Sequence, residues 1–320
     1  MVYDVVILGS GPAGLTAAIY TARARRSTLV LAGSAVGGQV ALTYAVENYP
    51  GFPEGVSGAE LARLMQEQAE RFGAQVEIDE ATAVDLGQRP FRVTAYGGEH
   101  QARSLIIATG ASPRKLGVPG EQEFTGRGVS YCATCDGFFY REKDVAVVGG
   151  GNSAVEEALY LTRFARRVYL IHRRRQLRAD AIVQERALAN DKITCLWERT
   201  VAEILGQQTV TGVRLCRCDS DEQEELAVDG VFIYIGMVPN TQLFAGQLEL
   251  NPWGYIVTDA AQHTSVPGVF AAGDVQELYL PQVATAVGSG ARAAMEADKY
   301  LAEEEHRAHP PRLRQEEETV

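Results

Sequence analysis

The sequence predicts an α/β chain built from two similar domains, because one short pattern occurs twice along its 320 residues. In each copy a short apolar strand runs into a glycine-rich turn, and the turn opens into a helix. Strand, glycine turn and helix form the first βα unit of a dinucleotide-binding domain. The copies lie about 140 residues apart, counted from Gly9 to Gly149, which indicates domain duplication rather than a short repeat. We therefore expect two Rossmann-like, three-layer domains.

The first copy begins near the N-terminus. Residues 3–8 are mostly apolar β-formers, typical of a buried strand, and residues 9–14 read GSGPAG before an expected helix over 15–23. Glycines there allow a tight turn, close approach of the backbone to a pyrophosphate at the helix N-terminus, and close helix–strand packing. A second strand is expected over 28–31. It is followed by Ala32, where such sites often carry an acidic residue for the ribose.

The second copy has a strand over 144–148, the turn GGGNSA over 149–154, a helix over 155–164 and a further strand over 167–171. At the tip of that last strand an NAD site would offer a carboxylate to the ribose 2′-hydroxyl. The chain instead offers HRRRQLR at 172–178. Guanidinium groups at this place suit a 2′-phosphate, so the pattern favours NADPH; the alternative is a solvated basic loop.

The domain boundaries follow from the segments between these patterns. Residues 113–119 are typical of a crossover out of the first domain, and residues 239–248 of a return to it. A strand over 269–272 and a helix over 282–301 would then complete the first domain, so the second domain is predicted to be inserted into a discontinuous first one. The expected ranges are 1–115 with 245–302 for the first domain, 116–244 for the second, and 303–320 for a flexible tail.

Two of the five cysteines, Cys132 and Cys135, have the spacing of a redox dithiol. A zinc site would need a second ligand pair, which the sequence does not offer at a suitable spacing, and structural thiols need no partner three residues away. Asp136 could supply a proton to the departing thiol if burial raises its pKa; the alternative is a helix cap or turn former. The other cysteines are expected to pack in the interior: Cys195, and Cys216 with Cys218 on a strand over 213–218.

Composition limits the possible functions. A net charge of −11 and a pI near 5.1 argue against a nucleic-acid partner, which would call for a basic face. No apolar run reaches the ~20 residues that span a bilayer. The first residues run straight into a strand, without a secretory signal. We therefore expect a cytoplasmic protein with no membrane partner, no nucleic-acid partner and no metal.

With these motifs assembled, the chain resembles the low-molecular-weight, bacterial-type thioredoxin reductases from Tyr3 to about Glu303. Several segments carry the resemblance beyond the two glycine turns. They are GGQ at 37–39, ENYPGFP at 47–53, ATGA at 108–111, CATCDG at 132–137, HRRRQLR at 172–178 and AAGDV at 271–275.

The resemblance implies a homodimer that passes electrons from NADPH through FAD to the Cys132–Cys135 disulfide and on to thioredoxin. It implies that Cys135 contacts the isoalloxazine ring, that Cys132 attacks the protein substrate, and that the nucleotide domain rotates relative to the FAD domain. The residues expected at the FAD are Gly9, Gly11, Pro12, Ala13, Gly14, Gly38, Gln39, Asn48, Thr109, Gly110, Gly273, Asp274, Gln282, Val283 and Ala284. Those expected at the NADPH are Gly149, Gly151, Asn152, Ser153, Ala154, His172, Arg173, Arg174 and Arg178.

The chain departs from the family at two places. Relatives usually carry Arg-Gln-Ala at the start of the last helix, whereas this chain has PQV at 281–283, and its polar tail extends past the usual end. We expect the missing arginine to leave one side of the flavin more open, to be filled by the tail, a partner protein or a second ligand. Two alternatives therefore stay open: a ferredoxin-dependent or thiol-disulfide oxidoreductase that does not use NADPH, and a non-catalytic FAD-binding sensor.

Overall fold

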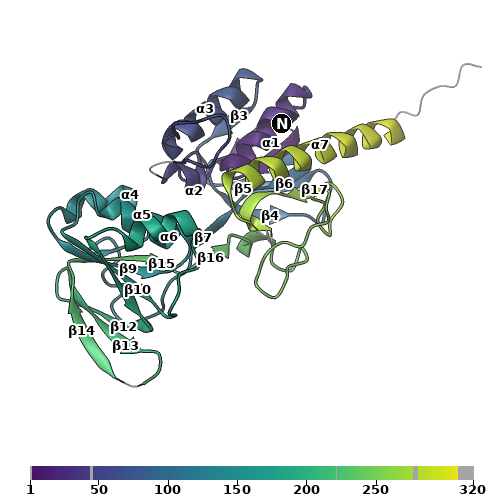
Figure 1. Ribbon diagram of the computed structural model, residues 1–320. Helices are drawn as coiled ribbons and strands as arrows, with labels where there is room; N and C mark the ends of the chain where they lie inside the picture. The colour runs from purple at the N-terminus through teal and green to yellow at the C-terminus, as the bar shows by residue number, and fades with distance from the viewer. Residues whose placement is uncertain (1, 44–45, 221, 277–279, 309–320) are drawn as a thin grey trace, which may run out of the picture. The chain divides into compact units, whose positions relative to one another are not determined.

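The computed structural model of the chain describes residues 2–43, 46–220, 222–276 and 280–308 (Figure 1). The chain divides into two compact units. The first comprises the residues up to Ala111 together with those from Pro239 onward, and the second comprises Ser112–Val238. The chain thus crosses over at Ala111 and Val238, rather than at the expected 115 and 244. Each unit is described by itself.

The first unit is built on a seven-stranded sheet of order β3-β2-β1-β6-β5-β4, with β17 also paired to β6. β1, β2, β3, β6 and β17 pair in parallel, whereas β4 and β5 form antiparallel pairs. The strands are β1 (Val2–Leu8), β2 (Thr28–Leu31), β3 (Gln75–Glu77), β4 (Ala81–Asp85), β5 (Phe91–Ala95), β6 (Gly98–Ile107) and β17 (Val269–Ala271).

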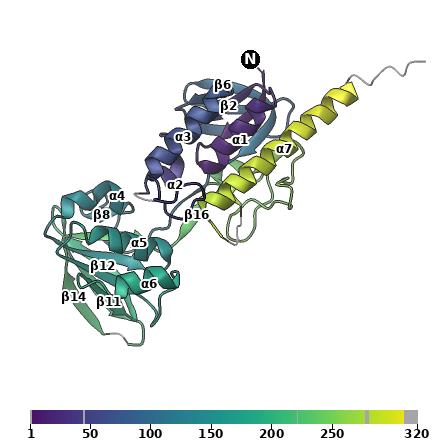
Figure 2. The same ribbon diagram turned by 45° about the horizontal axis from the view of Figure 1, so that its top comes forward.

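Both faces of this sheet are buried, which explains the unbroken apolar run in β1. Val5 and Ile7 belong to a core cluster with α1 (Pro12–Arg23) and α7 (Val283–Ala308), whereas Val6 and Leu8 belong to a cluster with β4, β5 and the segment from Phe244 to Val275. Figure 2 shows α1 and α7 side by side over the sheet. α2 (Gly38–Ala41) and α3 (Gly58–Arg71) complete the unit.

The second unit has three layers. A parallel sheet of order β11-β10-β9-β15-β8 lies between helices on one face and an antiparallel sheet, β12-β13-β14, on the other (Figure 1). The parallel strands are β8 (Val129–Ser130), β9 (Asp144–Gly149), β10 (Arg167–His172), β11 (Ile193–Trp197) and β15 (Gly230–Tyr234). The others are β12 (Arg199–Gly206), β13 (Val210–Arg217), β14 (Gln223–Ala227), α4 (Ala133–Asp136), η1 (Gly137–Tyr140), α5 (Asn152–Leu161) and α6 (Ala181–Leu188). The segments that join the units, β7 (Ala111–Pro113) and β16 (Met237–Pro239), pair with each other.

The helix ends differ from the prediction. α1 and α5 begin at Pro12 and Asn152, three residues earlier than expected, because the last glycine-rich residues already lie in the first helical turn. α5 correspondingly ends at Leu161 instead of 164. α7 runs on to Ala308, so residues 303–308 of the expected tail are helical; residues 309–320 lie outside the described residues.

Ion pairs tie the last turns of α7 to the rest of the first unit. Arg26 pairs with Asp298 and Glu305 at 2.7 Å each, and Arg103 pairs with Asp4 and Glu305 at 2.8 Å each. Glu305 thus ties α7 to the start of β2 and to β6. These contacts belong to side chains distant in sequence, which a local pattern does not reveal.

The three other cysteines are free thiols, and the predicted burial is wrong for one of them. Cys195 on β11 packs against a core cluster, and burial raises its pKa. Cys216 is half-buried near the end of β13. Cys218 is exposed instead of packed, because β13 ends at Arg217 and the turn carries it into solvent.

Candidate active site

Close packing shapes the first glycine turn. Gly9 has a φ of 103°, and a Cβ there would lie 2.2 Å from the carbonyl oxygen of Ala108. A Cβ at Gly14 would lie 2.0 Å from the carbonyl oxygen of Gly9. Gly11 is different, because its Cβ would meet nothing closer than 4.0 Å. α1 begins directly after it, with Pro12 in the first turn and no side-chain cap. An uncapped helix N-terminus beside open space suits a pyrophosphate.

Residues predicted at the FAD come to this turn from distant parts of the chain. A Cβ at Gly38 would lie 3.3 Å from Cα of Gly11, so α2 begins against the turn. The side-chain amide of Asn48 donates to Oε1 of Gln282 at 2.9 Å. The fold thus joins the segment after α2 to the segment before α7, as a shared ligand site would require.

Two further predicted residues lie just past the end of β6. The hydroxyl of Thr109 donates to the carbonyl oxygen of Asn240 at 2.8 Å, and the backbone N–H of Asn240 donates to the carbonyl oxygen of Gly110 at 3.0 Å. Gln39 donates from Nε2 to the carbonyl oxygen of Ala111 at 3.5 Å. These contacts fix the backbone at the carboxyl end of a parallel strand, where ligands bind in open α/β sheets.

Asp274 has a polar atom that the described residues do not satisfy. It lies on η3 (Gly273–Val275), and its Oδ1 is buried with no hydrogen-bond partner. Burial raises the pKa of this carboxyl. Its neighbour Gly273 has a φ of 74° and donates its N–H to Oγ of Ser289 at 2.9 Å. A buried, unpaired carboxylate oxygen fits a ligand rich in hydroxyl groups, such as the ribityl chain of FAD.

The start of α7 keeps a regular helix N-terminus despite the proline. Pro281 is exposed, and the N–H of Gln282 donates to Oγ1 of Thr285 at 3.1 Å. Val283 packs against a core cluster, whereas Ala284 is exposed. The change from Arg-Gln-Ala therefore removes a charge without disturbing the helix.

The second glycine turn repeats the first in outline. Gly149 has a φ of 154°, and a Cβ there would lie 2.3 Å from the carbonyl oxygen of Tyr234 and 2.6 Å from Cβ of Ala154. A Cβ at Gly151 would have no neighbour within 4 Å, and α5 begins after it without a side-chain cap. The geometry again suits a pyrophosphate.

Polar contacts hold the loop beside this turn. Asn152 donates from Nδ2 to Oδ2 of Asp180 at 3.0 Å, and its Oδ1 accepts the N–H of Asp180 at 2.6 Å. The ring of His172 is buried, and its Nε2 lies 3.0 Å from the carbonyl oxygen of Gln176. Burial lowers the pKa of His172, so its ring shapes the loop from beneath as a neutral group.

The arginines of the basic loop differ in whether they form ion pairs. Arg175 pairs with Glu198 at 2.7 Å. Arg173, Arg174 and Arg178 are exposed, and none forms an ion pair with the residues that the structure describes. Ser153, at the start of α5, is exposed as well. The loop therefore presents three available guanidinium groups and one hydroxyl, which suits a phosphate monoester.

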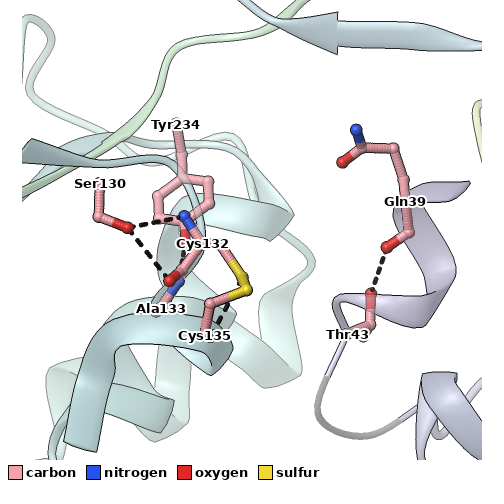
Figure 3. Close-up of a disulfide and its surroundings, with 7 residues drawn as sticks. All are labelled: Gln39, Thr43, Ser130, Cys132, Ala133, Cys135 and Tyr234. Carbon is pink, nitrogen blue, oxygen red and sulfur yellow. Dashed lines mark hydrogen bonds between the residues drawn. A yellow bond between two sulfur atoms is a disulfide. The ribbon is translucent and has the colours of Figure 1, made fainter. Parts of the chain in front are cut away.

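The predicted dithiol is a disulfide. Cys132 and Cys135 are bonded, with their Cα atoms 5.3 Å apart, and Cys132 immediately precedes α4 (Figure 3). The N–H of Cys135 donates to Sγ of Cys132 at 3.1 Å, and the N–H of Cys132 donates to Oγ of Ser130 at 3.0 Å. Cys132 is half-buried and Cys135 is exposed. The motif lies directly after β8, at the carboxyl edge of the parallel sheet.

Asp136 is half-buried at the end of α4. It lines a pocket of about 280 Å³ together with Phe139, Tyr140 and Lys143. Its charge contributes to raising the pKa of Tyr140, after the larger effect of burial. The position is compatible with the acid role, which stays a prediction.

Sequence reasoning missed two residues behind the disulfide. Tyr234, the last residue of β15, accepts the N–H of Ala133 on its hydroxyl at 2.7 Å (Figure 3). Glu157 lies on α5 with a buried Oε2 that has no partner among the described residues. A polar residue at the carboxyl end of a parallel strand was the signal available for Tyr234. Glu157 left no signal, because the EE pair at 156–157 reads as a solvated face.

No helix among the described residues is long and apolar enough to cross a membrane. No cluster of three potential metal ligands exists in the part of the chain that the structure describes.

The fold and the site together define a class. One unit offers a glycine turn and an unpaired buried carboxyl, and the other offers a glycine turn, a basic loop and a disulfide, as in a nucleotide-dependent disulfide oxidoreductase. The chain belongs to the pyridine nucleotide-disulphide oxidoreductase family, whose profile matches residues 3–290. The enzyme class predicted from the sequence, an FAD-dependent disulfide oxidoreductase, is confirmed.

Individual relatives agree with this assignment. The chain is 52% identical to a thioredoxin reductase of Mycolicibacterium smegmatis over 95% of this chain and 98% of the relative. The crystal structure of Lactococcus lactis thioredoxin reductase in its FR conformation matches with a TM-score of 0.92 and 44% identity, covering 94% of this chain and 99% of that one. The crystal structure of T. acidophilum thioredoxin reductase matches with a TM-score of 0.88 and 37% identity, covering 93% of this chain and 98% of that one. The resemblance and the two-domain fold class are thereby confirmed.

Proposed function

We propose that the chain is an NADPH-dependent thioredoxin reductase, which moves electrons from NADPH through FAD to the Cys132–Cys135 disulfide and on to thioredoxin. One observation carries the proposal. A single parallel sheet in the second unit presents both a disulfide and a glycine turn with three available arginines. The similarity to thioredoxin reductases over nearly the whole chain supports the substrate.

The first unit would hold FAD, which when bound accepts a hydride from NADPH and passes two electrons to a disulfide. The N-terminus of α1 would face the pyrophosphate, and Gly11 would let the backbone approach it. Asp274 would accept a hydrogen bond from the ribityl chain with its unpaired Oδ1. Asn48 and Gln282, which are already hydrogen-bonded to each other, would line the same site.

The second unit would hold NADPH. The N-terminus of α5 would face its pyrophosphate, and Arg173, Arg174 and Arg178 would hold the 2′-phosphate by charge-assisted hydrogen bonds. His172 would support this loop instead of touching the phosphate, because its ring is buried and its Nε2 contacts the carbonyl oxygen of Gln176.

The reduced dithiol would transfer electrons to thioredoxin by exchange. The thiolate of Cys132 attacks one sulfur of the substrate disulfide, and the other sulfur leaves as a thiolate that Asp136 protonates. The thiolate of Cys135 then attacks Cys132 in the mixed disulfide, which reforms the Cys132–Cys135 bond and releases the reduced substrate. Two electrons leave the enzyme in each cycle, and NADPH replaces them.

An anaerobic titration tests the proposal against its alternatives. The purified protein is titrated with NADPH, NADH and then dithiothreitol while the flavin absorbance is followed. Bleaching by NADPH alone supports the proposal. Bleaching by dithiothreitol but not by NADPH supports an enzyme with another electron partner. This alternative is considered because Pro281 stands where relatives usually carry an arginine. A flavin that neither reductant bleaches indicates a sensor.

We also propose that the protein is a cytoplasmic homodimer. The resemblance to thioredoxin reductases supports the dimer, and the three free cysteines suit a reducing compartment. Light scattering on the purified protein tests the dimer: a monomeric mass at micromolar concentration would contradict it.

A further inference from the structure

We propose that Glu157 is a positioning residue for the dithiol: near the phenol of Tyr234, its carboxyl takes up a proton from solvent when a thiolate forms at Cys132 or Cys135. The inference rests on the redox role of that disulfide proposed above. It adds a group that does not itself exchange electrons.

The place of Glu157 in α5 is unusual for a carboxyl. Ala154, Ala158 and Leu161 form the buried face of this helix, and Glu157 lies three residues after the first and four before the last. It therefore shares their face, which packs against the parallel sheet and α4. Its Oε2 is buried and has no hydrogen-bond partner among the described residues. Burying a carboxylate without a hydrogen-bond partner costs free energy of folding, which indicates that this carboxyl has a role other than stability.

Tyr234 connects this position to the dithiol. Its hydroxyl accepts the N–H of Ala133 at 2.7 Å, and Ala133 follows Cys132 directly and is fully buried. Burial raises the pKa of Tyr234, and the negative charge of Glu157 raises it further, so the two groups lie within electrostatic reach. Figure 3 shows the Tyr234 ring beside the backbone of Cys132 and Ala133.

The charge of Glu157 changes in the physiological range. Burial, and then the charge of Glu156 on the same helix, raise the pKa of Glu157 to about 7. Titratable groups on neighbouring elements are Tyr234 on β15, Asp136 on α4 and His172 at the end of β10. The charge of Asp136 also raises the pKa of Tyr234. Burial lowers the pKa of His172 and keeps its ring neutral. The carboxyl of Glu157 can therefore change its charge near neutral pH.

Like charges link the carboxyl to the dithiol. Two electrons and one proton convert the disulfide into one thiol and one thiolate. Below pH 7 Glu157 is already protonated and the new thiolate meets a neutral neighbour. Above pH 7 the thiolate meets a carboxylate, so Glu157 takes a second proton from solvent as the thiolate forms. By reciprocity, an ionised Glu157 raises the pKa of the thiol.

The test follows the reduced dithiol without using NADPH. The protein is reduced with dithiothreitol, the reductant is removed under nitrogen, and the rate of alkylation by iodoacetamide is measured from pH 5.5 to 8.5. Glu157→Gln is expected to shift the rate profile to lower pH by about half to one unit, because a lost like charge lowers the thiol pKa. Above pH 7, and where the wild-type thiol is still mostly protonated, the variant should therefore react about 3- to 10-fold faster than wild type. The two should react equally at pH 5.5, where the carboxyl is neutral.

Matched variants keep the result interpretable. Glu156→Gln removes the adjacent exposed carboxyl and should keep the wild-type profile to within about twofold. Glu157→Asp keeps a titrating carboxyl and should retain the pH-dependent difference from Glu157→Gln, even if its packing costs stability. Superimposable profiles for wild type, Glu157→Gln and Glu157→Asp would overturn the inference. That result would leave the proposed reductase function standing, because the function is decided by the NADPH titration alone.

Discussion

The two glycine turns share a backbone and differ in what surrounds it. Each has a left-handed first glycine pressed against a neighbouring carbonyl, and each opens into a helix with no side-chain cap. The first turn packs against Ala108, and the following strand leads to the buried Ala32. The second packs against Tyr234, and the following strand leads to the basic loop. The glycines thus provide a general phosphate cradle, and the ends of neighbouring strands determine which nucleotide is bound and which chemistry lies beside it.

The largest effect is expected from removing the disulfide, a feature that only the second unit has. Replacing either cysteine of the disulfide by serine should lower disulfide reductase activity by more than about 10³-fold, because thiol exchange needs both sulfurs. The spectra should differ. Cys135→Ser should lose the long-wavelength thiolate–flavin band on reduction, whereas Cys132→Ser should keep or strengthen it. Identical spectra for the two variants would show that the assigned order is wrong.

The next prediction separates the two cradles. Gly11→Ala should yield protein largely free of FAD, whereas Gly151→Ala should keep FAD and raise the KM for NADPH by about 10- to 100-fold. Neither added methyl meets a protein atom closer than 4.0 Å, so both variants should fold. Flavin content from absorbance and steady-state kinetics measure the two effects. Loss of FAD in both variants would show that the cradles are not independent.

Coenzyme preference tests the basic loop. Arg173→Ala combined with Arg174→Ala should raise the KM for NADPH far more than that for NADH, because each charge-assisted contact to the 2′-phosphate contributes about 1.5–3 kcal/mol. Arg175→Ala is the control, since that side chain is already paired with Glu198. An unchanged preference in the double variant would remove the 2′-phosphate assignment and favour another electron partner.

The pH dependence of stability offers a smaller effect. Folding raises the pKa of Glu157, so its contribution to stability is complete below the pKa of the unfolded chain and is lost as the pH rises towards 7. The free energy of unfolding of Glu157→Gln, relative to that of wild type, should therefore rise by on the order of 1–3 kcal/mol from pH 5 to pH 8. Urea unfolding at the two pH values measures the gain. Equal changes in Glu156→Gln would assign it to net charge instead.

The smallest effect concerns the end of the chain. Truncation after Leu301 removes Glu305 and its pairs with Arg26 and Arg103, and should lower the stability of the first unit by about 1 kcal/mol or less. Truncation after Ala308 should leave melting temperature, flavin spectrum and reductase rate unchanged. A changed flavin spectrum after the second truncation would instead indicate that residues 309–320 cover the more open side of the flavin.

Local pattern was enough to predict most of the site and not all of the fold. Strands such as residues 28–31 and 144–148, both glycine turns and the dithiol follow from short-range alternation and spacing. The C-terminal end of α7 was not predicted, and there Glu305 pairs with Arg26 and Arg103, which are far away in the sequence. The contact of Asn48 with Gln282 spans the inserted unit, and Glu157 became notable only when packing buried its carboxyl. Such features arise from the tertiary structure, which periodicity does not encode.

The packing of α7 on α1 has a consequence for synthesis on the ribosome. A Cβ at Gly290 would lie 2.2 Å from the carbonyl oxygen of Ala13, and Ala293 and Ala297 fill the same core as Ala17. The first unit therefore lacks one wall of its core until the last helix has been translated. The inserted unit, in contrast, has all of its strands once Val238 has left the exit tunnel. Domains fold as units during translation, so we expect the nucleotide unit to fold before the flavin unit that encloses it in the sequence, with flavin uptake as a late step in maturation.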